Sequence, residues 1–337
     1  MSKNVLITGI TGQDGAYLAD HLLKSGFNVF GGYRRSSTVN DWRLKNLKIE
    51  NEVEFIEFDL LEFSNIFRTI EQVEPCMVFN LAAQSFVSTS FQQPIVTSDI
   101  NALGTIRILE AIKTINKKIK FYQASTSEMF GMVQDKIQNE KTSFYPRSPY
   151  GVSKLFGHWS AINYREAYDM FVCSGILFNH ESPLRGNEFV TKKIVSNLTD
   201  IKFGRKEKLK LGNIFAKRDW GYAKDYVEGM FKIITHSKPD DFVLATGTCN
   251  TIKDFCDISS KYLEIDLIWV GEGKDTIGID NKSGQTIIEI DEKFYRPTEV
   301  DYLIGDASKA KSELNWSPKT NLDELIKIMI EYEVSIR

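Results

Sequence analysis

A glycine-rich stretch near residue 10 constrains the fold of this chain most strongly. Residues 3–8 read as a short buried strand, and an amphipathic helix is predicted to run to about Ser25. Between them, glycines at 9, 12 and 15 form the pattern Gly-x-x-Gly-x-x-Gly. The first permits a tight turn, the second lets backbone approach a pyrophosphate, and the third allows close helix–strand packing. This order predicts a dinucleotide-binding site, although a simple tight turn is the alternative. We expect cofactor contacts from Gly9, Thr11, Gly12, Gln13, Asp14 and Gly15.

The end of the second predicted strand, residues 28–33, indicates which dinucleotide is bound. An acidic residue at this place would accept a hydrogen bond from the adenosine ribose 2′-OH. Here Arg34, Arg35 and Ser36 stand instead. Arginines and hydroxyl groups suit a 2′-phosphate, so the sequence favours NADP over NAD. The alternative is an ordinary basic loop.

Strands and helices alternate through the rest of the first half. A strand at residues 53–58, a helix from Ser64, a strand at 77–80, a helix at about 98–114 and a strand at 119–124 follow one another. This alternation predicts an α/β fold with a Rossmann-type doubly wound parallel sheet. The residues after the third and fourth strands are expected to flank the adenine and the nicotinamide half of the cofactor: Asp59, Leu60, Leu81, Ala82, Ala83, Gln84 and Ser85.

Two further patterns carry the chemistry. Tyr150 and Lys154 are four residues apart and fall on one face of a helix that is predicted to start near Ser148. A Lys ammonium close to a Tyr hydroxyl favours the phenolate, which is a base. Ser125-Thr126-Ser127-Glu128 lies at the C-terminal end of a predicted central strand, where open α/β sheets bind ligands. The alternatives are an exposed Tyr–Lys pair and a helix cap with a turn.

Composition narrows the class of protein. Of the 337 residues, 42% are hydrophobic, so a sizeable core can form. The net charge of -3, with both signs mixed, favours neither nucleic acid nor a membrane surface as partner. We see no membrane-spanning run or signal peptide, and the four cysteines lack metal-ligand spacing, so no metal is expected. A cytoplasmic enzyme is the expectation.

Longer strings resemble a known family. The glycine pattern and Tyr-x-x-x-Lys are typical of the extended short-chain dehydrogenase/reductase superfamily of nucleotide-sugar enzymes. The order and spacing of further strings look like the GDP-mannose 4,6-dehydratase family over nearly the whole chain. These strings are Gln123-Ala124-Ser125-Thr126-Ser127-Glu128, Phe144-Tyr145-Pro146-Arg147-Ser148-Pro149-Tyr150, Asn179-His180-Glu181-Ser182-Pro183, Phe189-Val190-Thr191, Arg218-Asp219-Trp220-Gly221 and Tyr295-Arg296-Pro297-Thr298-Glu299-Val300.

The resemblance implies that the two halves of the chain bind different ligands. Residues 1–178 would mainly form the NADP-binding Rossmann domain, and 179–337 mainly a smaller α/β lobe that binds a GDP-sugar, with excursions back to the sheet. His180 and Arg185 would lie near the cofactor. The substrate would contact Ser85, Glu128, Asn179, Val190, Lys193, Gly212, Arg218, Arg296 and Glu299.

The resemblance also implies a reaction without net redox change. Tyr150 would act as base at the sugar 4-OH, Lys154 would lower the pKa of Tyr150, and Thr126 would hydrogen-bond the 4-oxygen. Glu128 would remove the C5 proton and protonate the leaving C6 hydroxyl. A nucleotide-sugar 4-epimerase or reductase is an alternative, in which Glu128 would be dispensable. The family also implies a homodimer or homotetramer.

Three departures from the family's pattern lie in the substrate half. Tyr222 stands where the family usually has His, Leu184 where Arg is common, and residues 271–290 look shorter than usual. These departures bear on which sugar is bound rather than on which reaction is catalysed. A GDP-D-glycero-manno-heptose is therefore the alternative substrate to GDP-mannose.

Overall fold

The computed structural model describes residues 3–38, 40–295, 297–298, 300 and 302–337. At its centre is a seven-stranded sheet of order β11-β6-β5-β4-β1-β2-β3, in which all neighbouring strands are parallel. This confirms the predicted doubly wound α/β fold. The strands are β1 (Asn4–Thr8), β2 (Asn28–Tyr33), β3 (Val53–Glu57), β4 (Met77–Asn80), β5 (Lys120–Thr126), β6 (Val172–Leu177) and β11 (Asp241–Leu244).

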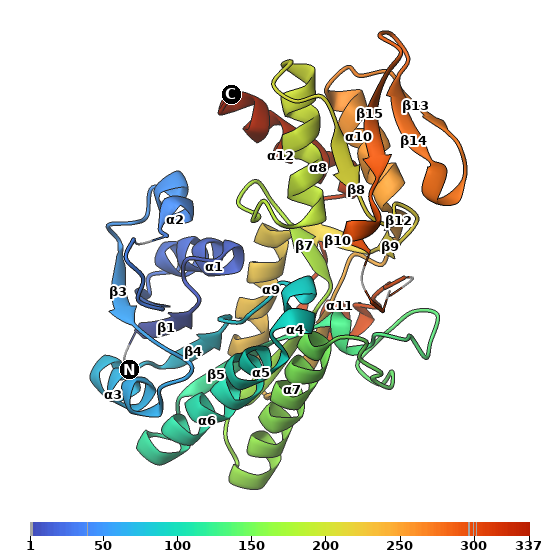
Figure 1. Cartoon of the computed structure of the whole chain (residues 1–337). Helices are drawn as coiled ribbons and strands as arrows, with labels where there is room; N and C mark the ends of the chain where they lie inside the picture. The colour runs from blue at the N-terminus through green and yellow to red at the C-terminus, as the bar shows by residue number, and fades with distance from the viewer. Residues whose placement is uncertain (1–2, 39, 296, 299, 301) are drawn as a thin grey trace.

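Helices cover both faces of this sheet, because its strands are apolar on both sides. On β1, Val5 and Ile7 belong to the core on one face and Leu6 to the core on the other. The first face packs against α1 (Gln13–Lys24) and α9 (Ala223–Thr235). The second packs against α3 (Phe63–Val73), α6 (Gly104–Ile115) and α7 (Pro149–Tyr168). Figure 1 shows the sheet between these two layers.

The direction of winding reverses between β1 and β4, which is where such folds bind their ligands. The chain proceeds from β1 outward to β3 and then returns to β4 on the other side of β1. Here the Thr8 hydroxyl donates to Asn80 Oδ1 at 2.9 Å and accepts the backbone N–H groups of Leu81 and Ala82. This hydrogen bonding holds the segment after β4 against the glycine loop.

One predicted helix has a more complex structure. Instead of a uniform helix at 98–114, the chain forms α4 (Val87–Gln92), α5 (Pro94–Ser98), a π-helical turn (Asp99–Leu103) and α6. Inside the turn, the Asn101 side chain exchanges hydrogen bonds with the backbone of Gln84 and donates to Ser153 on α7 at 3.1 Å. The wider turn therefore links the segment after β4 to the helix that carries Tyr150.

The second half of the chain forms a smaller lobe with its own apolar core (upper right in Figure 1). Its helices are α8 (Val190–Lys202), α10 (Ile252–Tyr262) and α12 (Leu322–Ser335), beside the four-stranded sheet β13-β14-β15-β8. The strands of that sheet are β8 (Leu209–Leu211), β13 (Leu267–Val270), β14 (Ile277–Asp280) and β15 (Gln285–Ile290), and the shorter elements of this half are α11 (Ser308–Leu314), β7 (Asn179–Glu181), β9 (Lys217–Arg218), β10 (Trp220–Tyr222) and β12 (Asn250–Thr251). The short helix α2 (Trp42–Leu47) belongs to the first half and follows β2.

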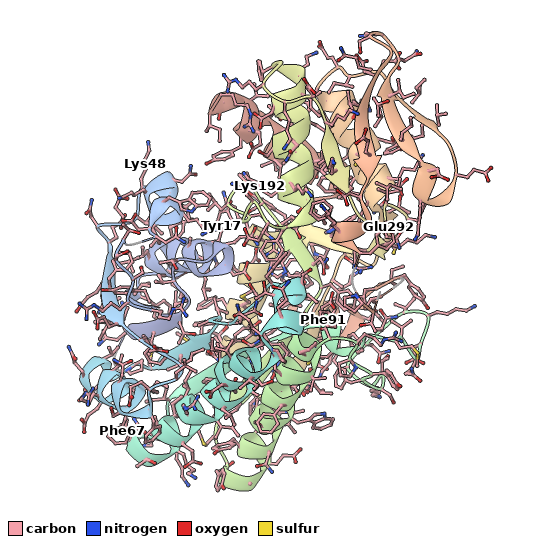
Figure 2. The ribbon with its side chains drawn as sticks, in the orientation of Figure 1. Tyr17, Lys48, Phe67, Phe91, Lys192 and Glu292 are labelled. Carbon is pink, nitrogen blue, oxygen red and sulfur yellow. The ribbon has the colours of Figure 1, made fainter. Side chains whose placement is uncertain are left out.

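The two halves are interleaved rather than separate. α9 and β11 come from the second half, yet they pack on and extend the large sheet. In Figure 2, Tyr17 on α1 and Lys192 on α8 lie where the two parts face each other. The division at residue 178 remains a prediction about the roles of the two halves.

The glycine loop generates a prediction about stability. A Cβ on Gly15 would lie 2.4 Å from the Gly9 carbonyl oxygen and 2.8 Å from Ile10 Cα, and both of these atoms belong to rigid backbone. Gly15→Ala is therefore expected to lower the free energy of unfolding by about 1–3 kcal/mol, measured by thermal or urea unfolding.

Gly12→Ala is the matched control. A Cβ there meets the Gly9 carbonyl oxygen only at 3.2 Å, and the position has no positive φ. We expect a clearly smaller loss of stability than for Gly15→Ala. Equal losses in the two variants would contradict the packing role of Gly15.

Candidate active site

Three adjoining cavities lie at the C-terminal edge of the large sheet. The central cavity, of about 360 Å³, is lined by the glycine loop, the end of β5, the start of α7 and residues 177–189. The strand-end cavity, of about 530 Å³, lies beside the ends of β2, β3 and β4. The lobe cavity, of about 610 Å³, is lined by residues between 179 and 218 and by residues 86–88, Ile252 and Phe294. Shared lining residues connect the central cavity to each of the other two.

The glycine loop forms one wall of the central cavity. Gly9 has φ +73° and its missing Cβ leaves room for the backbone of Ala82. Gly12 is the N-cap of α1 and makes no side-chain cap hydrogen bond, so the first N–H groups of the helix remain available. A helix N-terminus of this kind binds phosphate. All six residues predicted from this loop line the cavity: Gly9, Thr11, Gly12, Gln13, Asp14 and Gly15.

The predicted catalytic Tyr and Lys lie on the opposite wall. α7 begins at Pro149 after the N-cap Ser148, whose hydroxyl accepts the Gly151 N–H at 3.0 Å. One turn apart, Tyr150 and Lys154 are both buried and line the central cavity together with Thr126 from the end of β5. The Lys154 ammonium donates to the Ala124 carbonyl at 3.0 Å. Helix α7 is thereby joined to β5 beside Thr126.

The pKa values of this group depend mainly on burial. Burial raises the pKa of Tyr150 to about 12, against the opposing effects of a side-chain hydrogen bond with Thr126 and the positive charge of Arg185. Burial lowers the pKa of Lys154 to about 8. The sequence predicted that Lys154 would lower the pKa of Tyr150, but in the structure the effect of burial prevails.

Glu128 lies in the turn that follows Thr126 and not on the strand itself. β5 ends at Thr126, whose hydroxyl accepts the Glu128 N–H at 3.3 Å, and a short 3-10 turn spans Ser127–Met129. Glu128 is 8% exposed, and its negative charge raises the pKa of Tyr150. The Glu128 backbone packs against α7 next to Tyr150, since a Cβ on Gly151 would lie 2.8 Å from the Glu128 carbonyl oxygen, although Glu128 does not itself line the central cavity.

His180 and Asp14, which both line the central cavity, form an ion pair. His180 Nε2 lies 2.9 Å from Asp14 Oδ2, and His180 Nδ1 lies 2.7 Å from the Phe178 carbonyl oxygen. Both of these oxygens only accept hydrogen bonds, so both ring nitrogens donate and the ring is a cation. Burial alone would lower the pKa of His180, but the Asp14 carboxylate outweighs burial and raises it. Burial likewise raises the pKa of Asp14, but His180 and Arg185 lower it to about 2.

The strand-end cavity collects most of the other predicted cofactor residues. Its lining includes Arg34, Asp59, Leu60, Leu81, Ala82, Ala83, Gln84 and Ser85. Two predicted residues are not part of it. Arg35 is exposed and lies 3.8 Å from the Glu57 carboxylate, and the Ser36 hydroxyl donates to the Thr38 carbonyl at 2.6 Å. Of these two arginines, Arg34 is therefore the one that lines the strand-end cavity.

The lobe cavity collects the predicted substrate residues of the second half. Asn179, Val190, Lys193, Gly212 and Arg218 all line it. Arg218 is buried and donates to the Val300 carbonyl at 2.8 Å, while the Lys193 ammonium lies 3.4 Å from the centre of the Phe294 ring. The predicted Arg296 and Glu299 lie outside the described residues. His180 and Arg185 line the central cavity, and Arg185 also lines the lobe cavity.

Two departures from the family's pattern prove to be core residues. Leu184 is 1% exposed, and Tyr222 packs in the core of the second half with its ring 6.3 Å from that of Tyr17. Among the described residues, neither side chain lines any of the three cavities. These two positions therefore give no support to a different sugar.

Several site residues were missed by sequence reasoning. Arg43 on α2 donates to the carbonyl oxygens of Leu184 at 2.7 Å and Thr11 at 2.8 Å, and it lines the central cavity. Glu188 and Phe189 line both the central and the lobe cavity. Arg43 follows no motif, so no sequence signal points to it. Glu188 and Phe189 stand directly before Val190, and that position was the only available signal.

The ion pair generates a prediction about pH. In the unfolded chain His and Asp have pKa values near 6.5 and 3.8, and folding raises the first and lowers the second to about 2. The stabilisation from His180 is therefore complete below pH 6.5 and is lost as pH rises through its raised pKa. The stabilisation from Asp14 is complete above pH 3.8 and is lost as pH falls toward 2.

Asp14→Asn should reverse the shift of His180, because burial then acts without the opposing carboxylate. NMR titration of the four histidines should show the pKa of His180 above 6.5 in the parent and below 6.5 in the variant. His158, whose pKa burial lowers, serves as the internal control. An unchanged His180 pKa in the variant would contradict the assignment.

The described part of the chain contains no helix long and apolar enough to cross a membrane, and no cluster of three His, Cys, Asp or Glu side chains suited to a metal ion.

Comparison with known proteins identifies the family. A family model described as GDP-mannose 4,6 dehydratase matches residues 6–329. The chain is 45% identical over 342 residues to a GDP-mannose 4,6 dehydratase of Drosophila melanogaster, covering 99% of this chain and 87% of the relative. It is 47% identical over 348 residues to a GDP-mannose 4,6-dehydratase of Vibrio cholerae, covering 98% and 93%.

A solved structure agrees at the level of the fold. The dTDP-glucose 4,6-dehydratase of Bacillus anthracis, determined in complex with NAD, superposes with a TM-score of 0.81 at 20% identity, covering 98% of this chain and 96% of that one. The extent and identity of the sequence matches show that this chain belongs to the GDP-mannose 4,6-dehydratase family.

Proposed function

We propose that this enzyme is an NADP-dependent hydro-lyase that converts GDP-mannose to GDP-4-keto-6-deoxymannose and water. The observation that carries the proposal is the position of Glu128 beside a dehydrogenase-type group. Thr126, Tyr150 and Lys154 would also serve a 4-epimerase or a reductase. A buried carboxylate near Tyr150 supplies the additional acid–base group that elimination requires.

The cavities fit the two ligands of this reaction. The glycine loop and the N-terminus of α1 fit a pyrophosphate, and His180, Arg43 and Arg185 add positive charge around the central cavity. The chemistry that bound NADP would supply is acceptance of a hydride from C4 and return of a hydride to C6. In the lobe cavity, Arg218 and Lys193 provide the cations for the GDP diphosphate.

The proposed reaction assigns each step to a side chain of the site. Tyr150 removes the 4-OH proton while the hydride leaves C4, and Thr126 hydrogen-bonds the 4-oxygen. The resulting ketone acidifies the C5 proton, which passes to Glu128. The same carboxyl group protonates the C6 hydroxyl, which departs as water. In the last step the hydride returns to C6 and C5 gains a proton. Tyr150 gives up the proton that it took from the 4-OH, so the protons of the whole reaction balance and the phenolate is restored.

The assembly and its location are also part of the proposal. Apolar side chains are exposed along α5 and α7, including Ile95 (85%), Phe156 (46%) and Trp159 (54%). Their exposure supports a homodimer or homotetramer in which these helices pack against a second copy. We place the enzyme in the cytoplasm, where nucleotide sugars are available as substrates.

The proposed reaction is tested with the purified protein. Incubation with GDP-mannose should yield a 4-keto product and release water without net consumption of NADP(H). GDP-D-glycero-manno-heptose, assayed side by side, tests the alternative substrate, and a higher kcat/KM for the heptose would overturn GDP-mannose as the preferred substrate. Formation of a 4-epimer, or stoichiometric consumption of NADPH, would overturn the dehydratase assignment.

Glu128→Gln separates elimination from oxidation. The amide keeps the shape of the side chain but cannot accept the C5 proton, so kcat for product formation should fall about 10²–10⁴-fold. The variant should still reduce bound NADP on mixing with GDP-mannose, seen as absorbance of the reduced nicotinamide, and should exchange little solvent deuterium into C5.

Tyr150→Phe is the matched control, because it removes the base for the first step. It should abolish the absorbance signal itself. Turnover of Glu128→Gln near the parent rate, or loss of the absorbance signal as complete as in Tyr150→Phe, would contradict the role of Glu128.

The choice between NADP and NAD is tested at the arginine loop. Removing the Arg34 guanidinium from the strand-end cavity should weaken NADP binding by about 1.5–3 kcal/mol and leave NAD binding nearly unchanged. Arg35→Ala is the comparison, and its smaller effect would reflect the position of Arg35 near Glu57. Equal weakening of NADP and NAD in Arg34→Ala, measured by calorimetry, would contradict a 2′-phosphate contact.

A further inference from the structure

One loop belongs to both ligand cavities. Residues 182–189, the shared loop, connect β7 to α8. Arg185, Glu188 and Phe189 line the central cavity and the lobe cavity alike. The positions of these three side chains therefore affect the binding of both the dinucleotide and the nucleotide sugar. Backbone hydrogen bonds within the loop are few, so other contacts must hold it.

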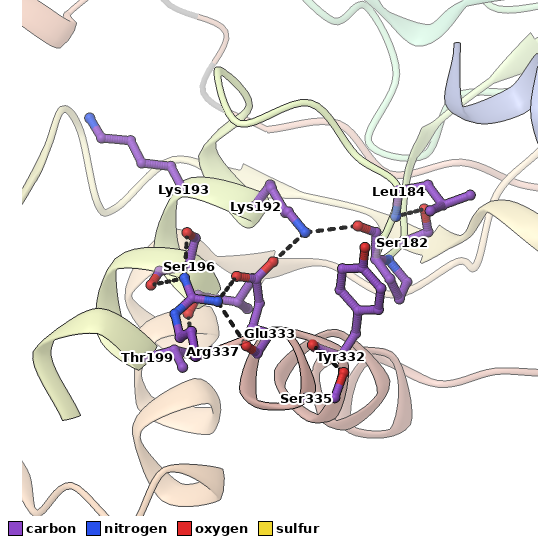
Figure 3. Close-up of polar contacts among 12 residues, drawn as sticks. Ser182, Leu184, Lys192, Lys193, Ser196, Thr199, Tyr332, Glu333, Ser335 and Arg337 are labelled. Atoms are coloured by element: carbon purple, nitrogen blue, oxygen red, sulfur yellow. Dashed lines mark hydrogen bonds and ion pairs between the residues drawn. The ribbon is translucent and has the colours of Figure 1, made fainter. Parts of the chain in front are cut away.

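Lys192 holds the start of the loop from the side of the second half. Its ammonium donates to the Pro183 carbonyl at 2.8 Å and forms an ion pair with the Glu333 carboxylate on α12 (Figure 3). The side chains of Lys192 and Glu333 are only 6% and 2% exposed. Each of these charges would be costly to bury without the other, so the ion pair stabilises both. The Pro183 carbonyl accepts a hydrogen bond from another N–H of the same ammonium.

Arg337 fixes the position of Glu333 in turn. Its guanidinium donates to the Glu333 carboxylate and to the Glu333 carbonyl oxygen at 2.8 Å. It also bonds Asp200 at 2.8 Å and the Ser196 hydroxyl at 2.9 Å, both on α8. Figure 3 shows this chain of contacts running from Arg337 to Lys192 and on to the shared loop. Helix α12 is thereby connected to the ligand cavities, although none of its residues lines them.

Arg43 holds the neighbouring residue of the loop from the opposite side. It joins the Leu184 carbonyl to the Thr11 carbonyl of the glycine loop. Consecutive carbonyl groups of the shared loop are thus bound by cations from the two halves of the molecule. The loop is held in place immediately before Arg185.

We propose that Lys192, supported by Glu333 and Arg337, is a positioning residue that fixes the shared loop for binding of both NADP and the GDP-sugar. The proposal builds on the proposed function, since it assumes these two ligands. The proposed catalytic residues lie on β5, on the 3-10 turn directly after it and on α7, and not on this loop. Loosening the loop should therefore weaken binding while the chemical step of the saturated enzyme remains.

The first variant is Lys192→Met, which keeps most of the side-chain volume and removes the ammonium. Calorimetry should show the Kd for GDP and the Kd for NADP both raised roughly tenfold, the loss expected for a hydrogen bond from a charged donor. KM for GDP-mannose should rise in parallel, while kcat changes less than about threefold, since the catalytic side chains are untouched.

A double variant separates positioning from stability. In Lys192→Met/Glu333→Met the carboxylate is also removed, and Arg337 keeps its ion pair with Asp200, so no buried charge is left without a partner and stability should return toward that of the parent. The Pro183 carbonyl still lacks its donor, so both Kd values should stay raised. If Lys192→Met does not fold, this double variant gives the same result.

Arg165→Met is the matched control. Arg165 also donates to a carboxylate, that of Asp241, and to a backbone carbonyl, that of Val172, but it lies far along α7 from the shared loop. It should lower the melting temperature and leave both Kd values unchanged. Parent-like Kd values in Lys192→Met, or recovery of binding together with stability in the double variant, would overturn the proposal.

The same measurements separate this proposal from the proposed function. A parent enzyme that binds GDP and NADP but does not convert GDP-mannose refutes the reaction and leaves the positioning test intact. A parent that binds neither ligand refutes both.

Discussion

The hydrogen bond from the Lys154 ammonium to the Ala124 carbonyl is the contact on which the rest of the site depends. A buried ammonium must find acceptors, and this one finds its acceptor on the strand that ends at Thr126. The bond sets the distance between α7 and β5, and so brings the Tyr150 phenol to the Thr126 hydroxyl. A second buried hydrogen bond, from Asn101 to Ser153, connects the same helix to the segment after β4, because Asn101 also donates to the Gln84 carbonyl.

Residues that act through a local pattern could be predicted from the sequence. The glycine loop, the Tyr–Lys pair and the ends of β3 and β4 each lie in a few consecutive residues, and strand–helix alternation decides which sheet edge they share. The proposed catalytic role of Glu128 rested on resemblance, and the structure adds that its backbone packs against Gly151, the residue after Tyr150. Glu128 is not part of the strand itself, since a 3-10 turn begins directly after Thr126.

Contacts between distant segments could not be predicted in this way. Arg43 enters the site because α2 packs beside the glycine loop, and the meeting of Lys192 with Glu333 joins positions 141 residues apart. The roles of Leu184 and Tyr222 also depend on tertiary packing, because an apolar side chain in a site-bearing segment can equally face the core. Arg35 shows the same limit. Arg34 lines the strand-end cavity, whereas the neighbouring Arg35 lies near the Glu57 carboxylate.

The position of β11 has a consequence for how the chain folds during synthesis. This last strand of the large sheet pairs with β6 and comes from residues 241–244, about seventy residues later in the chain. Its Asp241 carboxylate binds Arg165 on α7, so the helix that carries Tyr150 lacks one of its anchors until β11 has been added. Until then β6 is an open edge, which is prone to pair with other chains. A ribosome-bound chain that ends near residue 178 would therefore expose this edge, and the catalytic centre would mature only after the part of the second half up to β11 had been made.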